Sequence, residues 1–403
     1  ASTIYFNPAG MTQLQDREVS GGLAAIGPSF KFKDHGSRVG ANPPSFSAGG
    51  LMGTGNGGDA GSWAAVPNGY ISWALTKDLY VGLGVNAPFG LVTEYDDRWV
   101  GAAQSIKFDL ETININPSLA FRINDKVSIG AGLNWQRVKA EYVRLAATVA
   151  AAPIGTLADN VISTMKLEDD AWGWNAGALF TLSPTTKVGV SYRSSIKHDL
   201  KGDLSVSGPA AGANAALTTG AAKADVELPE TFILSVAQTL SDKWEMLGDV
   251  SWTGWSSIPK VDIVRTAGAL NGVTVQTLDT KFRDTWRFAL GANYRLNEQV
   301  KLKFGVAYDQ TPVQSDQHRL VSLPDSNRIW LSFGAKYDIN KQHSINAAYS
   351  HLFIQNASAN VNGWCGGTQS GAGSQACVSS RTNGSANFKS SANILGLQYT
   401  YKF

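Results

Sequence analysis

The sequence predicts an all-β protein: a 14-stranded antiparallel transmembrane β-barrel with an N-terminal segment inside its lumen. Three observations predict the barrel. Segments of alternating apolar and polar residues recur along the 403-residue chain. Tight turns alternate strictly with long polar loops, which is typical of outer-membrane barrels. No stretch approaches the roughly 18–20 consecutive apolar residues that a membrane-spanning helix requires.

The connections between strands fall into two classes. The tight turns lie at Lys77-Asp78, Asn124-Lys126, Pro184-Thr186, Ser241-Lys243, Asn297-Gln299 and Asn340-His343. The long connections lie near residues 33–65, 93–103, 148–168, 205–225, 265–281, 314–328 and 355–386. These 13 connections join 14 strands, and an even number places both chain ends on the same side of the sheet. We therefore expect a bacterial outer-membrane location.

The alternation is clearest in the last strand. One face carries Leu395, Leu397, Tyr399, Tyr401 and Phe403, and the other carries Gly396, Gln398, Thr400 and Lys402. A soluble β-sandwich would bury the apolar face, whereas a barrel of this size turns it towards lipid. Strand lengths near ten residues and the regular order of turns and loops favour the barrel.

Composition excludes several function classes. The formal charge is +2, and no basic run has interleaved aromatic residues, so we expect no nucleic-acid partner. Gly82-x-Gly84 is not a dinucleotide fingerprint, because no helix pattern follows and Ala87 replaces the third glycine. We expect no cofactor and no metal. The chain starts without a leader pattern, so we expect any signal peptide to have been removed.

The N-terminal residues 1–16 contain Asn7-Pro8-Ala9-Gly10 and are too irregular for a strand. The simplest place for them is the lumen, as part of a plug, with the barrel formed by residues 17–403. A frayed periplasmic tail is the alternative.

The third strand, which runs from Tyr80 to Gly90, contains a proline close to its end. Pro88 cannot donate to a ladder, and a neighbouring glycine weakens the pairing further. The pattern predicts a kink, bulge or gap in the wall at Pro88, Phe89 and Gly90. Alternatively, the strand ends at Asn86 and a loop begins.

Two long loops carry further patterns. In the loop at 148–168, Val161, Ile162 and Met165 have the spacing of one apolar helical face. Such a face would hold a greasy ligand or, alternatively, pack against a neighbouring loop. Cys365 and Cys377 lie in one Gly/Ser-rich loop without a nearby histidine, which indicates a disulfide in an oxidising compartment; a two-ligand metal site is the alternative.

A series of short motifs, each present once, also extends along essentially the whole chain. They are Asn7-Pro8-Ala9-Gly10, Val66-Pro67-Asn68, Phe89-Gly90-Leu91 with Glu94, Asp109-Leu110-Glu111-Thr112, Gly173-Trp174-Asn175-Ala176-Gly177, Tyr192-Arg193-Ser194, Leu228-Pro229-Glu230, Trp252-Thr253-Gly254-Trp255-Ser256, Trp286-Arg287-Phe288-Ala289-Leu290-Gly291, Asp309-Gln310-Thr311-Pro312-Val313 and Leu323-Pro324-Asp325-Ser326-Asn327-Arg328-Ile329-Trp330-Leu331-Ser332. Each motif is weak alone, but together they are specific. The chain resembles the FadL family of outer-membrane hydrophobic-compound transporters, which includes TodX-type aromatic hydrocarbon channels.

The resemblance implies a monomeric barrel closed by an N-terminal hatch, whose Asn-Pro-Ala turn matches Asn7, Pro8 and Ala9. It implies passive uptake of hydrophobic compounds, most of all long-chain fatty acids, with lateral exit at a kink that matches Gly90. Polar lipopolysaccharide blocks direct diffusion into the outer leaflet, and so a protein is needed. The family has a longer segment ahead of the Asn-Pro-Ala turn, so we expect that part of the hatch is missing here. A final strand that ends on an aromatic residue, Phe403, also resembles outer-membrane proteins, in which it addresses the chain to the barrel assembly machinery.

The resemblance further implies basic residues that meet a fatty-acid carboxylate. They match Arg144 and Arg283, although the family has lysine at the second position. Ordinary ion pairs in the lumen, with Glu141 or Asp284, are the alternative role. If that alternative holds, a monoaromatic hydrocarbon becomes the substrate to expect.

Two other functions compete with hydrophobic uptake. An outer-membrane lipolytic enzyme would need a serine, a histidine and a carboxylate at the barrel rim, but no nucleophile motif accompanies any of the five histidines, His35, His198, His318, His343 and His351. Asp169 and Asp170 are adjacent strand residues and point to opposite faces. We therefore expect no enzyme. A water-filled general porin is the second competitor, and the hatch turn argues against it.

Overall fold

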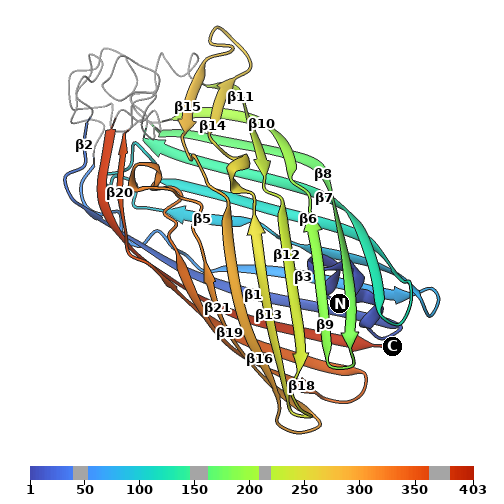
Figure 1. The fold of residues 1–403 in the computed structure, drawn as a ribbon. Coiled ribbons are helices and arrows are strands. Elements are labelled where there is room, and N and C mark those ends of the chain that lie inside the picture. The colour runs from blue at the N-terminus through green and yellow to red at the C-terminus, as the bar shows by residue number, and fades with distance from the viewer. Residues whose placement is uncertain (40–52, 146–161, 208–218, 363–381) are drawn as a thin grey trace.

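The computed structural model describes residues 1–39, 53–145, 162–207, 219–362 and 382–403. It is a closed antiparallel barrel of 14 spanning strands, so the predicted fold class is confirmed. Figure 1 shows a tilted, elongated barrel with both chain ends near the short turns. Among the described residues, no helix is both long and apolar enough to cross a membrane.

Several spans consist of two strands separated by a short interruption. The first seven spans are β1 (Arg17–Asp34), with β2 (Arg38–Val39) beyond it; β3 (Ala64–Ala74); β4 (Leu79–Asn86) with β5 (Gly90–Glu94); β6 (Lys107–Arg122); β7 (Val127–Leu145); β8 (Ile162–Ser183); and β9 (Thr186–Arg193) with β10 (Ile196–Ser207). The other seven are β11 (Gly220–Leu228) with β12 (Thr231–Thr239); β13 (Trp244–Thr253) with β14 (Val261–Arg265); β15 (Thr274–Leu278) with β16 (Thr285–Arg295); β17 (Val300–Asp309); β18 (Arg328–Asp338); β19 (His343–Ile354) with β20 (Ala357–Asn362); and β21 (Thr382–Lys402). The short helices are α1 (Thr3–Phe6), η1 (Pro8–Gln13), η4 (Trp255–Ser257) and η5 (Asp316–His318).

The barrel closes where the first strand meets the last. β1 pairs with β21 in antiparallel register from Glu18 opposite Lys402 to Asp34 opposite Ala386. Closure leaves no open sheet edge at this seam, which matters in lipid because no water is present to satisfy backbone N–H and C=O groups.

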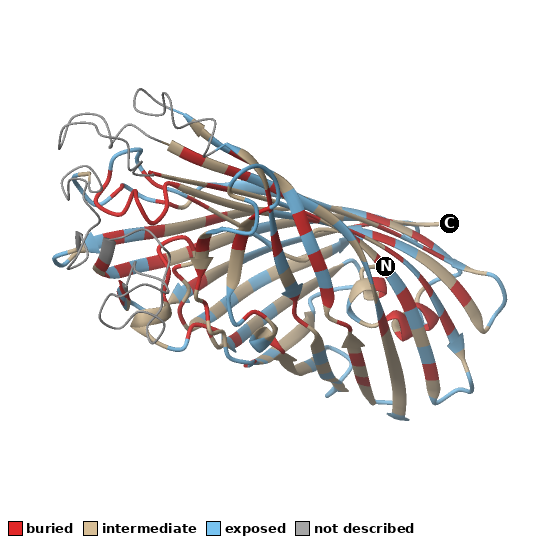
Figure 2. Ribbon diagram, turned by 90° about the horizontal axis from the view of Figure 1, so that it is seen from above, coloured by how far each residue is buried: buried red, intermediate tan, exposed pale blue. Residues whose placement is uncertain are grey.

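The outer face of the barrel is apolar, as the alternation predicts. In β21 the side chains of Leu395, Leu397 and Tyr399 are 51%, 58% and 44% exposed, whereas Thr400 is 7% exposed. Figure 2 shows the same alternation as bands of colour along several strands. Large exposed apolar side chains on a closed sheet form the surface that meets hydrocarbon.

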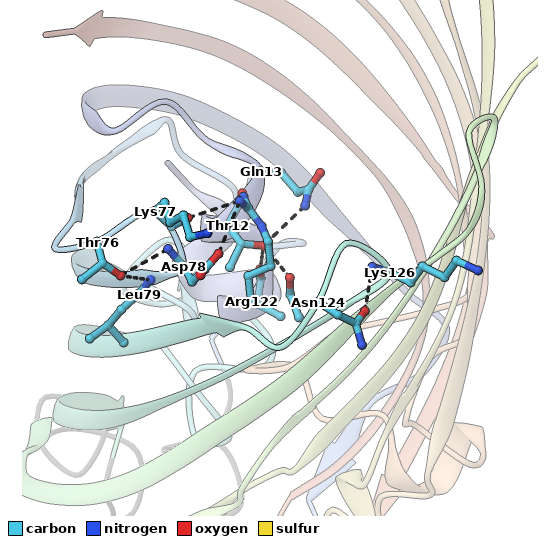
Figure 3. Close-up of polar contacts among 11 residues, drawn as sticks. Thr12, Gln13, Thr76, Lys77, Asp78, Leu79, Arg122, Asn124 and Lys126 are labelled. Carbon is cyan, nitrogen blue, oxygen red and sulfur yellow. Dashed lines mark hydrogen bonds and ion pairs between the residues drawn. The ribbon is translucent and has the colours of Figure 1, made fainter.

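The N-terminal helices α1 and η1 lie against the inner face of β4, β6, β7 and β8. Ile4 and Met11 are fully buried there. The Thr12 hydroxyl donates to Ser128 Oγ at 2.8 Å. From the end of β6, the Arg122 guanidinium donates to the Thr12 carbonyl and to the Lys77 carbonyl, and this joins the segment to a short turn (Figure 3). We refer to residues 1–16 as the hatch segment.

Glycines on the inner wall make room for the hatch segment. A Cβ atom at Gly177 would lie 2.1 Å from Asn7 Oδ1, and one at Gly130 would lie 2.5 Å from the Ala9 nitrogen. At Gly82, a Cβ would lie 2.5 Å from the Met11 sulfur. Any larger residue at these positions would therefore displace the hatch segment or the wall.

The structure corrects the interpretation of residues 148–168 over its last part. Ile162 and Met165 belong to strand β8, not to a helix, and Met165 is buried. Residues 162–168 pair with β7 on one side and with β10 on the other. Two complete ladders outweigh a weak helical pattern in this short segment. Val161, Cys365 and Cys377 lie outside the described residues.

Candidate functional site

The extracellular half of the barrel encloses an apolar cavity of about 310 Å³. Its walls come from strands β1, β5–β8, β10, β11, β14, β15 and β18 and from the segments between them. The largest apolar side chains in its wall are Phe30, Phe89, Phe108, Tyr142, Met165, Trp255 and Phe282. A mostly apolar enclosure with few polar groups is the usual form of a site for a greasy ligand.

The wall of the cavity includes the break in the third span. β4 ends at Asn86 and β5 begins at Gly90. The break is held to β6 because the Phe89 N–H donates to Thr112 Oγ1 at 3.0 Å. Phe89 also packs edge-on against Trp255, with ring centroids 6.0 Å apart. The sequence allows either a kink, bulge or gap in the wall or a strand that ends at Asn86. The structure combines features of both, because the strand ends at Asn86 and a new strand begins at Gly90 after a short interruption.

The ladder of the wall is interrupted beside this break, and we refer to the interval between β3 and β5 as the window. β3 pairs with β4 only from Gly69 to Ala74, and in the described part of the chain β5 forms a ladder with β6 alone. On the extracellular side of this interval, the Glu94 N–H at the end of β5 donates to the Ala60 carbonyl, just before β3, at 3.0 Å. Between the end of the β3–β4 ladder at Gly69 and the hydrogen bond of Glu94, the described residues form no ladder that joins β3 to β5.

Few polar groups reach the cavity. His198 is fully buried, and its Nδ1 and Nε2 lie 3.0 Å from Asp169 Oδ2 and from Gln136 Oε1. Asp169 also accepts the Asp199 N–H at 3.2 Å, at a level where β8 and β10 have no ladder between Glu168 and Asn175. The carboxylate thus replaces backbone bonds that the splayed strands do not make.

Among the described residues, Arg328 is the one arginine or lysine that lines the cavity. Its guanidinium contacts Asp309 at 3.0 Å and also Asp325, so two carboxylates already surround it. The sequence motif that contains Arg328 carried the family resemblance, but it gave no indication that this side chain reaches the cavity. For His198, the sequence offers only a weak enzymatic candidate and no sign that its side chain borders an apolar cavity.

Arg144 lies at the extracellular end of β7, and Arg283 lies in the interruption between β15 and β16, but neither is among the residues that line the cavity. Arg144 Nη1 lies 3.5 Å from the Ala103 carbonyl, and Arg283 Nε donates to the Thr311 carbonyl at 3.2 Å. Arg283 is next to Phe282, which does line the cavity. The two possible carboxylate partners have other contacts, Glu141 with Lys107 at 3.5 Å and Asp284 with the Ser256 N–H at 3.0 Å.

A serine and a histidine do meet near the rim, at η5. Ser315 Oγ lies 2.8 Å from His318 Nδ1, three residues apart in one turn. Burial lowers the pKa of His318, so its imidazole is neutral at pH 7. Neither residue lines the apolar cavity. Asp169 and Asp170 point to opposite sides of the wall, since Asp169 contacts buried His198 and Asp170 contacts Arg137 at 3.5 Å.

The hatch segment lies below the cavity and is held by its Asn-Pro-Ala turn. Asn7 Nδ2 donates to the carbonyls of Ala178 and Val190 at 3.1 and 3.3 Å, and Asn7 Oδ1 accepts the Ala9 N–H. Arg193 stacks over the Tyr5 ring at 3.8 Å and donates to the Tyr5 carbonyl. The segment therefore has specific bonds to β8 and β9 rather than a loose fit.

Comparison with known proteins identifies the family. A family model described as "Outer membrane protein transport protein (OMPP1/FadL/TodX)" matches residues 1–403. The chain is 32% identical over 433 residues to a putative outer membrane protein of Neisseria meningitidis serogroup B, covering 100% of this chain and 89% of the relative. It is 28% identical over 382 residues to a long-chain fatty acid transport protein of Escherichia coli O6:H1, covering 88% of this chain and 81% of the relative.

Solved structures agree on the fold. A crystal structure of a Pseudomonas aeruginosa FadL homologue superposes with a TM-score of 0.85 at 23% identity, covering 100% of this chain and 94% of that one. The Pseudomonas putida toluene transporter TodX gives a TM-score of 0.67 at 16% identity, with coverage of 100% and 94%. The chain therefore belongs to the OMPP1/FadL/TodX family of outer membrane transport proteins and is an outer-membrane β-barrel.

Proposed function

We propose that this barrel takes up hydrophobic compounds, most of all long-chain fatty acids, by passive diffusion. The ligand enters the apolar cavity from the extracellular side and leaves laterally through the window between β3 and β5. The hatch segment closes the lumen below the cavity. The observation that carries the proposal is that Phe89 and Gly90, at the break in the third span, belong to the cavity wall.

Partition physics supports lateral exit. Each CH₂ group taken out of water contributes roughly 0.8 kcal/mol, so a chain of about 16 carbons gains about 12 kcal/mol before the costs of ordering it. Immobilisation removes much of this gain and leaves an affinity from which the ligand can dissociate. A molecule that prefers hydrocarbon gains nothing by entering periplasmic water, whereas a window in the wall leads directly to the membrane.

The relatives support fatty acids as the substrate, because several are named long-chain fatty acid transport proteins, including that of Escherichia coli strain K12 at 29% identity over 327 residues. A carboxylate in an apolar cavity needs a cationic partner. We assign this role to Arg144 and Arg283, which would engage the headgroup at the edge of the cavity while the chain occupies the apolar part.

A monoaromatic hydrocarbon is the alternative substrate, and one observation favours it. Arg328, the cation in the cavity wall, is already paired with Asp309 and Asp325. A neutral ligand would leave these pairs intact, whereas a carboxylate beside them would meet two like charges.

Binding of radiolabelled oleate to the purified protein, with toluene as competitor, tests the proposal. We expect saturable oleate binding that falls at least tenfold in an Arg144→Ala/Arg283→Ala variant. Arg137→Ala is the matched control, because Arg137 pairs with Glu168 and Asp170 on the outer face. If the double variant binds oleate normally and toluene displaces it, the substrate is a neutral hydrocarbon and the two arginines are not the clamp.

A further inference from the structure

A second cavity, of about 340 Å³, lies in the lumen near the short turns. One side of it is formed by the end of the hatch segment, at Gln13, Leu14 and Gln15. The other side is formed by the inner faces of β16–β19 and β21. We refer to this space as the vestibule. It is separate from the apolar cavity and shares no lining residue with it.

The vestibule is lined by an excess of positive charge. Its lining includes the four lysines Lys301, Lys303, Lys336 and Lys402 but only one carboxylate, that of Glu18. Glu18 lies opposite Lys402 in the seam between β1 and β21. Lys336 Nζ has a further carboxylate, Asp338, at 3.2 Å. Lys303 Nζ has a neutral acceptor, Asn346 Oδ1, at 2.9 Å.

The strand register places like charges directly opposite one another. Lys301 on β17 is the cross-strand partner of Lys336 on β18, and on its other side it is the partner of Arg295 on β16. Residues in register share one face of a sheet, so three cations form one row across three strands. Like charges in this position are destabilising unless an anion lies between them.

The outer face of the same barrel shows the opposite arrangement. On β7 and β8, Lys139 lies opposite Glu168, and Glu141 lies opposite Lys166. Charges there alternate in sign across the strands, which is the favourable pattern. The row at Arg295, Lys301 and Lys336 therefore differs from the way in which this chain places charges on its exposed outer wall.

We propose that the vestibule is an oxyanion-binding site, which holds a phosphate or carboxylate group among Lys301, Lys303, Lys336 and Lys402. Ammonium groups bind oxyanions as mobile point charges with several donors each, and a lumen cavity of this size admits a small hydrated anion. The Asn346 amide and the glutamines of the hatch segment supply neutral polar groups around it. The site is independent of the ligand in the apolar cavity.

Titration calorimetry with inorganic phosphate tests this site on the full-length barrel in non-ionic detergent at low ionic strength, where screening is weak. We expect saturable binding that weakens at least tenfold in Lys301→Gln/Lys336→Gln. The matched control is Lys139→Gln/Lys166→Gln, which removes two exposed lysines from the outer face. Octanoate as competitor distinguishes the two sources of the oxyanion: displacement of phosphate assigns the site to the carboxylate of an amphiphile, and no displacement assigns it to a free inorganic anion.

Thermal unfolding gives a second readout. Phosphate should raise the unfolding midpoint of the unmodified barrel, because a ligand that binds the folded state stabilises it. Without phosphate, Lys301→Gln/Lys336→Gln should unfold at a higher temperature than the unmodified barrel, since it lacks the like-charge pair. The single variant Lys303→Gln provides a milder test if the double variant does not fold. The proposal is overturned if the unmodified barrel shows no saturable binding, or if the outer-face control weakens binding equally.

Discussion

At the residue scale, the hatch segment depends on a few side chains that fit the inner wall closely. Asn7 bridges the carbonyls of two adjacent strands, and Gly177 leaves room for it. Arg193 holds the neighbouring Tyr5 by its ring and its carbonyl. Each buried hydrogen bond contributes about 1 kcal/mol, so these few bonds hold the hatch segment against the wall but can break reversibly.

Gly177→Ala should release the Asn-Pro-Ala turn without unfolding the barrel. Its Cβ would lie 2.1 Å from Asn7 Oδ1, so Asn7 must move and lose its two bonds, at a cost of about 2 kcal/mol. Single-channel recordings in planar bilayers should then show a higher conductance. Gly396→Ala is the matched control, because a Cβ there meets nothing within 4 Å. Equal conductance in the two variants would contradict a closed hatch held by Asn7.

At the element scale, two of the interrupted spans contribute to the wall of the apolar cavity. The break between β4 and β5 lies beside the window, and the splayed seam between β8 and β10 brings His198 to the cavity. Both lie in the extracellular half, where residues above the lipid have water or loops as partners. Nearer the short turns, the ladders β12–β13, β13–β16 and β16–β17 run without interruption, since lipid-exposed backbone must be satisfied within the sheet.

Gly90→Trp tests the window between β3 and β5. A Cβ at Gly90 has only ordinary contact, with the Leu110 carbonyl at 3.6 Å, so the barrel should fold. The indole would occupy the window, and uptake of radiolabelled oleate by cells should fall at least tenfold. Oleate binding to the purified variant should persist, which separates exit from capture. Unchanged uptake would rule out exit at this place.

Removal of residues 1–14 tests the hatch segment as an element. The deletion leaves β1 intact and exposes the inner wall at Gly82, Gly130 and Gly177. We expect a several-fold rise in single-channel conductance, with the barrel still resistant to unfolding in detergent. If the intact protein already conducts as strongly as the deletion variant, it is a water-filled porin instead.

At the scale of the whole molecule, closure of β1 on β21 defines the barrel. The seam ends at Phe403, whose N–H donates to the Arg17 carbonyl at 3.1 Å. Its ring lies 4.7 Å from that of Tyr401 and 6.2 Å from that of Trp73. The chain therefore ends in an aromatic cluster at the periplasmic rim.

Deletion of Phe403 should reduce assembly into the outer membrane far more than it reduces stability. The residue makes few contacts and is 60% exposed, so the free energy of unfolding should change by about 1 kcal/mol or less. Quantitative detection in outer-membrane fractions, beside refolding of the same variant in detergent, separates the two effects. Equal loss in both assays would mean that Phe403 is structural rather than a signal to the assembly machinery.

The fold class, the number of spans and the lipid-facing side can be predicted from the amino-acid pattern alone, because an alternation of period two and the order of turns are local properties of the chain. The pattern also predicts an interruption of the strand at Pro88 to Gly90, since a proline cannot donate a backbone hydrogen bond to a ladder wherever its strand lies in the sheet. Family motifs added the hatch turn and the transport class.

Which side chains share a space depends on how the strands pair in three dimensions. His198, Asp169 and Gln136 come from three strands, and Lys301, Lys336 and Arg295 meet only through register. Alternation indicates the face on which a residue lies, but not its neighbour across the sheet. That neighbour depends on the stagger of paired strands, which long-range closure sets. For the same reason Arg328, and not Arg144 or Arg283, lines the apolar cavity.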